Sequence, residues 1–422
     1  MTVSARTVIR PHLLLDVVTG ELLADRAVVI DGNRIAGVVA AGDAPAEGPG
    51  FVDLLGQTLL PGLIDCHTHL VGEPDSGQGY AELLARTGAQ EALSGARNAR
   101  DTLLAGFTAV RDVGTFRAFV DVALRDAINA GWVAGPRMLA AGAYVTCSGG
   151  GGDITGLAPD VDPVVPYEFR VGVVDSVDDI RRAVRRVLHG GADFVKLIAT
   201  GAVMAPGGVP GAPELTEEQI RAAVEEASLS GADVAAHAHG AEGIKRAVRS
   251  GVRSIEHGSL MDDQSIEMMA AAGTFLVADV YNGDYIAQTG REQGWRADVL
   301  AKNDQTTLAQ REGFTKCLAA GVRIAFGTDS GIYPHGLNAR QFAYQVRCGQ
   351  SPLAAIQSAT IHAAELIRSA DRIGRIAPGY LADVIAVNGN PLQDIRLLEN
   401  SVFVMKDGAI QHGGPGPQAT RE

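Results

Sequence analysis

The sequence predicts an α/β fold, in which a (β/α)8 TIM barrel is joined to a small β-sandwich domain built from both ends of the chain. Two patterns support this prediction. In the middle of the chain, short apolar segments alternate with longer amphipathic segments, as strands and helices do in such barrels. At both ends, short runs of Val, Ile and Leu are separated by turns such as Asp-Gly and Asn-Gly, which is typical of antiparallel strands.

The length of the chain fits this organisation. It has 422 residues, of which 46% are hydrophobic and 20% are charged. A single hydrophobic core stops growing near about 250–300 residues, so we expect one large domain and a smaller one. We place the two parts of the sandwich domain at 1–58 and 373–422, and the barrel at 59–372.

Eight apolar segments are the expected barrel strands: 59–69, 107–113, 137–145, 194–200, 233–240, 253–259, 274–280 and 323–330. The amphipathic segments between them begin with Ser, Thr or acidic residues and end at Gly, as capped helices do. The clearest of these are 176–191, 216–231 and 241–251. A doubly wound open sheet is the alternative, but no Gly-x-Gly-x-x-Gly turn follows the first strand.

Composition excludes several classes of protein. The net charge is −13 and Lys and Arg form no stripe, so we expect no nucleic-acid partner. The four cysteines form no Cys-x-x-Cys pair, which favours a reducing compartment over a disulfide framework. No apolar stretch is long enough to span a bilayer, and the N-terminus lacks a secretory layout. We expect a cytoplasmic protein without a membrane segment.

Residues of types that commonly bind metals occur where the expected strands end. Barrel enzymes build their active sites at these strand ends. These residues are His67 and His69 in the first strand, Lys196 in the fourth, His237 and His239 in the fifth, His257 in the sixth and Asp329 in the eighth. Because residues i and i+2 of a strand share a face, each His-x-His pair is expected to point toward the barrel axis.

The residue types in this set favour zinc. Imidazole binds Zn well, and a carboxylate completes such a site. Lys196 inside a strand is costly as a bare ammonium, whereas a carbamate formed with carbon dioxide would be an anionic ligand. Such a ligand can bridge two metals about 3.5–4 Å apart. Taken alone, Lys196 could extend its amine to solvent and Asp329 could cap a helix, and a single His-x-His pair could arise by chance.

In their order along the chain, the motifs Pro-Gly-Leu-Ile-Asp-Cys-His-Thr-His-Leu, Phe-Val-Lys-Leu-Ile-Ala-Thr-Gly, Val-Ala-Ala-His-Ala-His-Gly, Ser-Ile-Glu-His-Gly and Gly-Thr-Asp-Ser-Gly resemble the amidohydrolase superfamily over nearly the whole length. The resemblance implies a barrel with a composite sheet domain and two divalent metal ions. One ion would be held by His67, His69 and Asp329, the other by His237 and His257, and both by carboxylated Lys196.

The resemblance also implies hydrolysis of an amide-type C–N bond. Two cations lower the pKa of a bridging water so that hydroxide forms near neutral pH. Asp329 would take the proton of this hydroxide and return it to the leaving nitrogen. Relatives often assemble, so we expect a homo-oligomer that acts on a small amide or peptide substrate.

The segments 277–287, 311–336 and 338–360 look most like the branch of imidazolonepropionase-related dipeptidases and carboxypeptidases, which includes amidohydrolases that cleave ochratoxin. In that branch, the position of His239 tends to bind the free carboxylate of the substrate. A substrate-binding or catalytic role is therefore expected for His239. Many relatives carry Gly-Gly-His-Gly-Asp after the third strand, whereas Gly151 stands here in place of the His. We expect this change to open space for a bulkier acyl group.

Other residues are less defined by the sequence. Tyr281 and His335 lie in loops after the seventh and eighth strands and are expected near the substrate, while Asp284 could contact substrate or form a turn. Glu256 and Asp65 alternate with expected ligands and should point away from the axis, as packing or turn residues. Cys66 is expected in the core. His12, His189, His362 and His412 are expected to be structural or solvated.

Three functions compete. A binuclear metal-dependent amidase or peptidase that releases a C-terminal amino acid accounts best for the motifs. A cyclic-amide hydrolase of the imidazolonepropionase or dihydropyrimidinase sort would use the same ligands, and only pocket shape separates it from the first. A non-catalytic scaffold would have lost ligands, and every ligand position is filled here.

Overall fold

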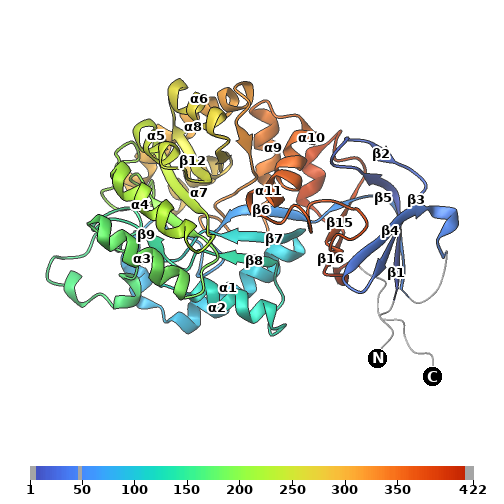
Figure 1. Cartoon of the computed structure of the whole chain (residues 1–422), viewed down its shortest axis with the longest axis horizontal. Coiled ribbons are helices and arrows are strands. Elements are labelled where there is room, and N and C mark those ends of the chain that lie inside the picture. Colours follow the sequence, from blue (N-terminus) through green and yellow to red (C-terminus); the bar gives the residue numbers. More distant parts are fainter. Residues whose placement is uncertain (1–5, 46–49, 414–422) are drawn as a thin grey trace.

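The computed structural model describes residues 6–45 and 50–413, so residues 1–5, 46–49 and 414–422 of the predicted sandwich domain lie outside it. The described chain has an α/β fold with two parallel sheets and one larger mixed sheet (Figure 1). This architecture confirms the predicted α/β class and the parallel strands at its centre.

The two parallel sheets contain all eight segments that were expected to be strands. The first has the order β6-β7-β8 and the second has the order β14-β13-β12-β11-β10-β9. Their bounds are β6 Leu63–Thr68, β7 Phe107–Asp112, β8 Arg137–Ala140, β9 Tyr144–Val145, β10 Val195–Ile198, β11 Val234–Gly240, β12 Ser254–Leu260, β13 Phe275–Val277 and β14 Arg323–Ile324. The third expected strand is divided into β8 and β9 by a short break.

Hydrogen bonds join the first strand to the chain that follows the last one. The amide of Cys66 in β6 donates to the carbonyl of Phe326 at 2.8 Å. Further along, Thr68 forms a parallel bridge with Ser330. These contacts place the carboxyl end of β6 beside the segment that carries Asp329.

Helices follow most of the strands. They are α1 Gly88–Leu104, α2 Val120–Asn129, α3 Val177–His189, α4 Glu217–Ser228, α5 Ala241–Arg249, α6 Asp263–Ala272, α7 Asn282–Gln293, α8 Ala297–Ala319, α9 Arg340–Arg347, α10 Pro352–Ser358 and α11 Ile361–Leu366, with the 3₁₀ turns η1 Ala41–Asp43, η2 Tyr80–Ala85, η3 Asp162–Val164, η4 Tyr167–Phe169 and η5 Ile395–Glu399.

Local sequence explains where several helices begin. Thr216 and Gln219 form a capping box at the start of α4, and Ser176 and Asp179 form one at the start of α3. In a capping box two side chains satisfy backbone groups that the first turn leaves unpaired. The predicted helices at 176–191, 216–231 and 241–251 are confirmed.

Both ends of the chain contribute to one eight-stranded sheet, in the order β17-β16-β15-β5-β1-β3-β4 with β2 paired to β1. The bounds are β1 Thr7–Leu15, β2 Leu22–Leu23, β3 Arg26–Asp31, β4 Arg34–Ala40, β5 Phe51–Pro61, β15 Val384–Asn388, β16 Phe403–Lys406 and β17 Ala409–His412. Figure 1 shows these blue and red strands together at one end of the molecule. Antiparallel pairing was expected throughout, but β1 and β5 pair in parallel.

The core follows from this arrangement. The largest buried cluster includes Val195 and Leu197 of β10 and Ala236 and Ala238 of β11, which lie against apolar residues of α3, α4 and α5. On these strands the residues that alternate with the cluster are Lys196, His237 and His239. The strands therefore bury their apolar side chains under helices and leave polar ones on the opposite face. Among the described helices, none is both long and apolar enough to cross a lipid bilayer.

Candidate active site

A cavity of about 210 Å³ lies at the carboxyl ends of the parallel strands. It brings together all seven residues that were predicted to bind metal or substrate at the strand ends: His67, His69, Lys196, His237, His239, His257 and Asp329. These side chains come from five different strands or the segments that follow them.

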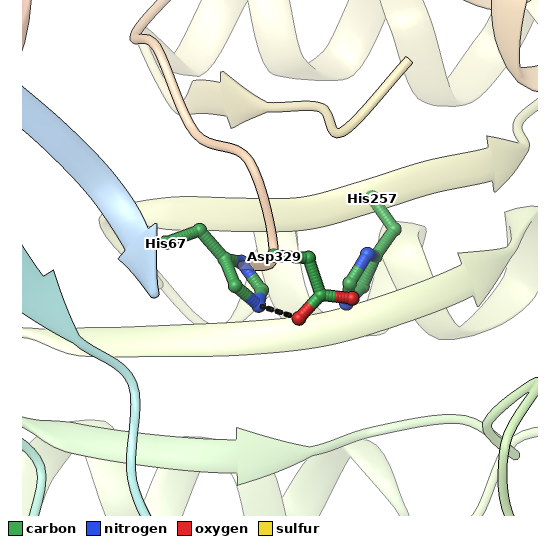
Figure 2. A group of neighbouring side chains, drawn as sticks. All are labelled: His67, His257 and Asp329. Atoms are coloured by element: carbon green, nitrogen blue, oxygen red, sulfur yellow. Dashed lines mark ion pairs between the residues drawn. The ribbon is translucent and has the colours of Figure 1, made fainter. Parts of the chain in front are cut away.

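Three of these residues are close enough to share one ion. One ligand atom each from His67, His257 and Asp329 lies within 4.8 Å of the others. The distance from Nε2 of His67 to Oδ1 of Asp329 is 3.3 Å, and the centroids of the two imidazole rings are 4.7 Å apart. Figure 2 shows the three side chains pointing toward one another. They can hold a divalent metal ion, because imidazole and carboxylate are ligands that such ions prefer.

His69 reaches the same carboxylate from a neighbouring position. Its Nε2 lies 3.2 Å from Oδ1 of Asp329. On the other side of the ring, Nδ1 donates to the carbonyl of Gly114 at 2.9 Å. Because a carbonyl only accepts, this bond requires the hydrogen to be on Nδ1 and leaves Nε2 to face the centre of the site.

The imidazole rings of His237 and His239 also lie next to the ring of His257. The ring of His237 is 4.6 Å from each of the other two, measured between centroids. Nε2 of His237 is buried and has no hydrogen-bond partner among the described residues. Burial and the neighbouring imidazoles hold the pKa of His237 well below its ordinary value, so the ring is neutral. A buried neutral nitrogen without a partner is a group that a metal ion would satisfy.

Lys196 lines the same cavity and is buried, with only 1% of its surface exposed. Burial lowers the pKa of its amine to about 8, with the cation of Arg111 acting in the same direction and the carboxylate of Glu256 opposing it. A substantial fraction of the amine is therefore neutral near physiological pH. The neutral form is the nucleophile that carbamate formation needs.

Carboxylates hold two of the histidines from behind. Nδ1 of His67 donates to Oε2 of Glu256 at 2.8 Å, and Nδ1 of His257 donates to Oδ1 of Asp279 at 2.9 Å. Such contacts fix the tautomer and direct Nε2 toward a metal position. Burial raises the pKa of Asp279, but the positive charge of His257 outweighs it and lowers the value to about 2, so this carboxylate is ionised.

The prediction that Glu256 points away from the axis was wrong. Glu256 is fully buried and also accepts from Arg111 at 2.7 Å and from Ser254 at 2.5 Å. His257 has a φ of +69°, in the left-handed region, so the regular alternation of the strand stops at this residue. Consecutive side chains can therefore both face the interior. Asp329 also has a positive φ, of +57°, and non-glycine residues in this conformation concentrate at functional sites.

Neither Asp65 nor Cys66 lines the cavity, although strict alternation along β6 would place Asp65 on the same face as His67. Asp65 accepts from Thr328 at 2.6 Å and from Asn338 at 2.8 Å, and it also receives the backbone amide of His67. These bonds tie the end of β6 to the segment that carries Asp329. The packing and turn role expected of Asp65, and the core position expected of Cys66, are confirmed.

Asp329 is held as an anion. Burial opposes its ionisation, but hydrogen bonds and charge from His67 and His69 outweigh this and hold the pKa of Asp329 well below its ordinary value. Its second oxygen, Oδ2, accepts from Asn282 at 3.1 Å. The carboxylate is therefore fixed in direction by three side chains and is free of a proton at neutral pH.

Gly151 lies in the cavity wall, but the space beside it is not open. A Cβ at this position would lie 2.9 Å from Cβ of Ala202 and 3.3 Å from Cγ2 of Ile198. The carboxylate of Glu214 accepts from the amide of Gly151 at 2.9 Å, and Tyr80 donates to its carbonyl at 3.3 Å. Ala202 and Ile198 therefore occupy the space directly beside Gly151, and the expected acceptance of a larger acyl group stays a prediction.

The structure does not place the three predicted loop residues in the cavity wall. The ring of Tyr281 packs between Tyr333 and Tyr344, with 5.1 Å between centroids in each case, and Arg340 donates to its hydroxyl at 3.1 Å. Asp284 pairs with Arg311 at 2.7 Å near the surface. His335 is half-buried outside the cavity, and neither of its ring nitrogens has a hydrogen-bond partner among the described residues.

Four lining residues were not singled out from the sequence. Tyr80, Phe116 and Tyr144 form an aromatic wall, with centroid distances of 4.4 Å between the first two and 5.0 Å between the last two. Arg86 also lines the cavity and forms no ion pair with any described residue. Two of these residues belong to the long segment between β6 and α1, whose length was the only available sign that it covers the site.

Comparison with known proteins agrees with this geometry. The model of the amidohydrolase family matches residues 58–413. The chain belongs to the amidohydrolase family. It is an enzyme, a hydrolase that acts on amide bonds.

Individual amidohydrolases are similar over most of the chain. Ochratoxinase of Aspergillus niger is 33% identical and the match covers 94% of this chain and 85% of that protein. Imidazolonepropionase of Micrococcus luteus is 26% identical and the match covers 86% and 88%. A crystal structure of an Xaa-Pro dipeptidase with methionine in the active site is 38% identical, with a TM-score of 0.88 and coverage of 96% and 99%.

Proposed function

We propose that this amidohydrolase is a binuclear metal-dependent enzyme that releases a C-terminal amino acid from dipeptides or N-acyl amino acids. The observation that carries the proposal is the composition of the cavity: a cluster of imidazoles, an amine and a carboxylate, an aromatic wall, and an arginine that has no ion-pair partner in the described part of the chain. The similarity to an ochratoxinase and to an Xaa-Pro dipeptidase supports the same substrate class.

We assign one ion to His67, His69 and Asp329, a second ion to His237 and His257, and both to Lys196 after carboxylation. Support comes from the buried, unpartnered Nε2 of His237, from the ionised Asp329 and from the lowered pKa of Lys196. The imidazole-rich ligand set favours zinc. Two such ions, when bound, supply a hydroxide near neutral pH and polarise the substrate carbonyl.

The side chains of the protein would divide the remaining work. Asp329 is ionised and can accept a proton, which it would then give to the leaving nitrogen. Glu256 and Asp279 keep His67 and His257 in the tautomer that presents Nε2. His239 is neutral, because burial and the nearby charge of His257 lower its pKa to about 3, and its Nδ1 lies 2.8 Å from the hydroxyl of Ser259. We propose that it contacts the substrate.

The architecture proposed for this site is a closed (β/α)8 barrel at 59–372, with a β-sandwich formed by 1–58 and 373–422. The bridge between Thr68 and Ser330 supports closure, because it joins the first strand to the segment after the last one. The pairing of β5 with β15 supports a terminal domain drawn from both ends of the chain.

Arg86 supports a substrate with a free carboxylate. Its neighbour Arg117 is already occupied, since it donates to Glu91 at 3.0 Å and to the carbonyl of Arg86 at 2.6 Å. The guanidinium of Arg86 is available in the cavity wall, and arginine binds carboxylates through two parallel hydrogen bonds. We propose that Arg86 binds the carboxylate of the amino acid to be released.

A substrate panel tests the proposed function. Metal-replete enzyme is incubated with dipeptides, N-acyl amino acids that carry small or aromatic acyl groups, and the same compounds with the carboxylate converted to an amide; released amino acid is measured by mass spectrometry. We expect release from free acids with a KM lower than that of the amides by about 10- to 100-fold, the value of one charge-assisted hydrogen bond. Equal KM values, or activity confined to cyclic amides, would contradict the proposal.

The variant Arg86→Met sharpens this test. It should raise KM for the free acids while leaving KM for the corresponding amides unchanged, so that the preference for a carboxylate disappears. Arg125→Met provides a matched control, because Arg125 pairs with Asp193 at 2.7 Å away from the cavity. A loss of activity that is equal for acids and amides in Arg86→Met would indicate a structural role instead.

A further inference from the structure

The carboxamide of Asn282 joins two carboxylates of the active site. Asn282 is the first residue of α7, lines the cavity and has only 4% of its surface exposed. Its Nδ2 donates to Oδ2 of Asp279 at 3.1 Å and to Oδ2 of Asp329 at 3.1 Å. Both hydrogens of this nitrogen are therefore used. One bond holds the carboxylate that supports His257, and the other holds the carboxylate that we propose as the proton carrier.

These two bonds fix the orientation of the amide. An ionised carboxylate only accepts hydrogen bonds, so the nitrogen of Asn282, and not its oxygen, must face Asp279 and Asp329. The oxygen, Oδ1, is then an acceptor on the other arm of the same group. It is buried and has no hydrogen-bond partner among the described residues. A buried acceptor without a partner costs about 1–3 kcal/mol, so a donor that reaches Oδ1 from outside the chain is favoured.

Packing holds the amide in this orientation. The next residue is Gly283, where a Cβ would collide with Oγ1 of Thr307, so the first turn of α7 lies directly against α8. Asp279 is held as well, because its Oδ1 accepts from His257 at 2.9 Å and from Gln310 at 2.8 Å. The start of α7 and the carboxylate beside it are thus both fixed in place. An acceptor that is positioned before the substrate arrives loses little freedom on binding.

We propose that Oδ1 of Asn282 accepts a hydrogen bond from the N–H of the scissile amide, so that the enzyme selects secondary amides over tertiary ones. To return a proton to the leaving nitrogen, Asp329 must come within hydrogen-bond distance of it, and Asn282 is bonded to the same carboxylate. The hydrogen bond strengthens as the nitrogen gains a proton and positive charge, and no proton passes to Asn282. This inference rests on the proposed amide hydrolysis and narrows its substrate class.

Two inhibitors that differ in one group test this proposal. A phosphonamidate carries P–NH where the substrate has its scissile N–H, and the matching phosphinate carries P–CH2 at that place. Zinc-loaded wild-type enzyme should bind the phosphonamidate about 10- to 100-fold more tightly, the value of a hydrogen bond to an otherwise unpaired buried acceptor. A ratio of the two inhibition constants within threefold would overturn the proposal without any variant.

The variant Asn282→Leu assigns the effect to this residue. It keeps a side chain of similar size and removes the oxygen, so the ratio should fall below about threefold. Loss of the bonds to the two carboxylates weakens both inhibitors alike and cancels from the ratio. Asn303→Leu is the matched control: Asn303 lines the same cavity, but its Nδ2 donates to the carbonyl of Gly283 at 2.9 Å and its Oδ1 accepts from Thr307 at 3.3 Å. Its ratio should equal that of the wild type.

Hydrolysis gives a second readout. For an N-acyl amino acid and its N-methyl form, wild-type kcat/KM should be at least about 10-fold higher for the secondary amide, and Asn282→Leu should narrow this difference. A preference for P–NH and for the secondary amide that persists undiminished in Asn282→Leu would overturn the proposal. Failure of the proposed function would show differently: neither inhibitor would bind the zinc-loaded enzyme, and free acids would not be preferred over their amides.

Discussion

Nδ1 of His67 donates to Glu256 at 2.8 Å, and Nε2 of the same ring lies 3.3 Å from Asp329. The two carboxylates therefore hold the imidazole from opposite sides. Glu256 is itself anchored by Arg111, whose Nε donates to the carbonyl of Cys66 at 2.6 Å. The position of a predicted metal ligand thus depends on a buried ion pair that lies behind it.

Replacing Glu256 with Gln should weaken metal binding. The amide cannot balance the charge of Arg111 and holds Nδ1 of His67 less firmly, so we expect a loss of about 10- to 100-fold in affinity for the ion bound by His67. Calorimetric titration of the metal-free protein with Zn²⁺ measures this affinity. Glu226→Gln is the control, because Glu226 is a buried partner of Arg185 between α3 and α4. Wild-type affinity in Glu256→Gln would show that the bond to His67 does not position a ligand.

Metal uptake should depend on pH through Lys196. The neutral amine reacts with carbon dioxide and the ammonium does not, and the pKa of Lys196 is lowered to about 8. Metal-free protein depleted of bicarbonate should therefore take up metal faster above pH 8 than well below it, and added bicarbonate should increase the rate. Stopped-flow metal binding measures this. In Lys196→Met, neither pH nor bicarbonate should have this effect; if the dependence persists in that variant, Lys196 is not its source.

The same shift predicts how stability changes with pH in the metal-free protein. Lys196 has a pKa of about 8 when folded and an ordinary value of 10.5 when unfolded. Between these values the unfolded chain binds more protons, so the contribution of this group to the free energy of unfolding rises with pH. Urea unfolding across this pH window should show that the free energy of unfolding rises more steeply with pH in the wild-type protein than in Lys196→Met. Parallel curves would mean that the amine titrates normally.

Asp329→Asn should abolish most of the activity and leave the fold intact. The amide cannot accept a proton, and general acid–base groups contribute on the order of 10²–10⁴-fold to rate, so kcat should fall within that range. Asp284→Asn is the control: its carboxylate pairs with Arg311 near the surface, and activity should stay within about threefold of wild type. A kcat for Asp329→Asn close to that of wild type would exclude Asp329 as the proton carrier.

Gly151→Ala should be destabilising because of a specific contact. The added Cβ would lie 2.9 Å from Cβ of Ala202, and overpacking of this kind costs about 1–3 kcal/mol. The double variant Gly151→Ala with Ala202→Gly removes the colliding methyl group and should recover most of the lost free energy of unfolding. Thermal unfolding of the single and double variants measures both effects. Additive losses in the double variant would show that the two residues do not compete for the same space.

Much of the site could be predicted from the sequence because regular strands impose a regular alternation. His67 and His69, and likewise His237 and His239, are two residues apart and line the same cavity as expected. The strand ends also gave Lys196 its place. Alternation failed at Glu256, because the positive φ of His257 interrupts the strand and no feature of the sequence signals that conformation.

Loop residues could not be placed in the same way. Tyr281 follows the seventh strand, as expected of a substrate contact, but it directly precedes α7 and its ring packs among other tyrosines. Tyr144 and Arg86 line the cavity without a motif that marks them. Their positions depend on a break in the third strand and on the path of the segment after β6, which are set by tertiary packing rather than by local pattern.

A crystal structure grown with excess Zn²⁺ and bicarbonate tests the two-metal site most directly. Data collected at the zinc absorption edge should show two anomalous peaks, one beside His67, His69 and Asp329 and one beside His237 and His257, with extra density for a carboxyl group on Nζ of Lys196. An unmodified Lys196 with no anomalous peak among these side chains would contradict the account.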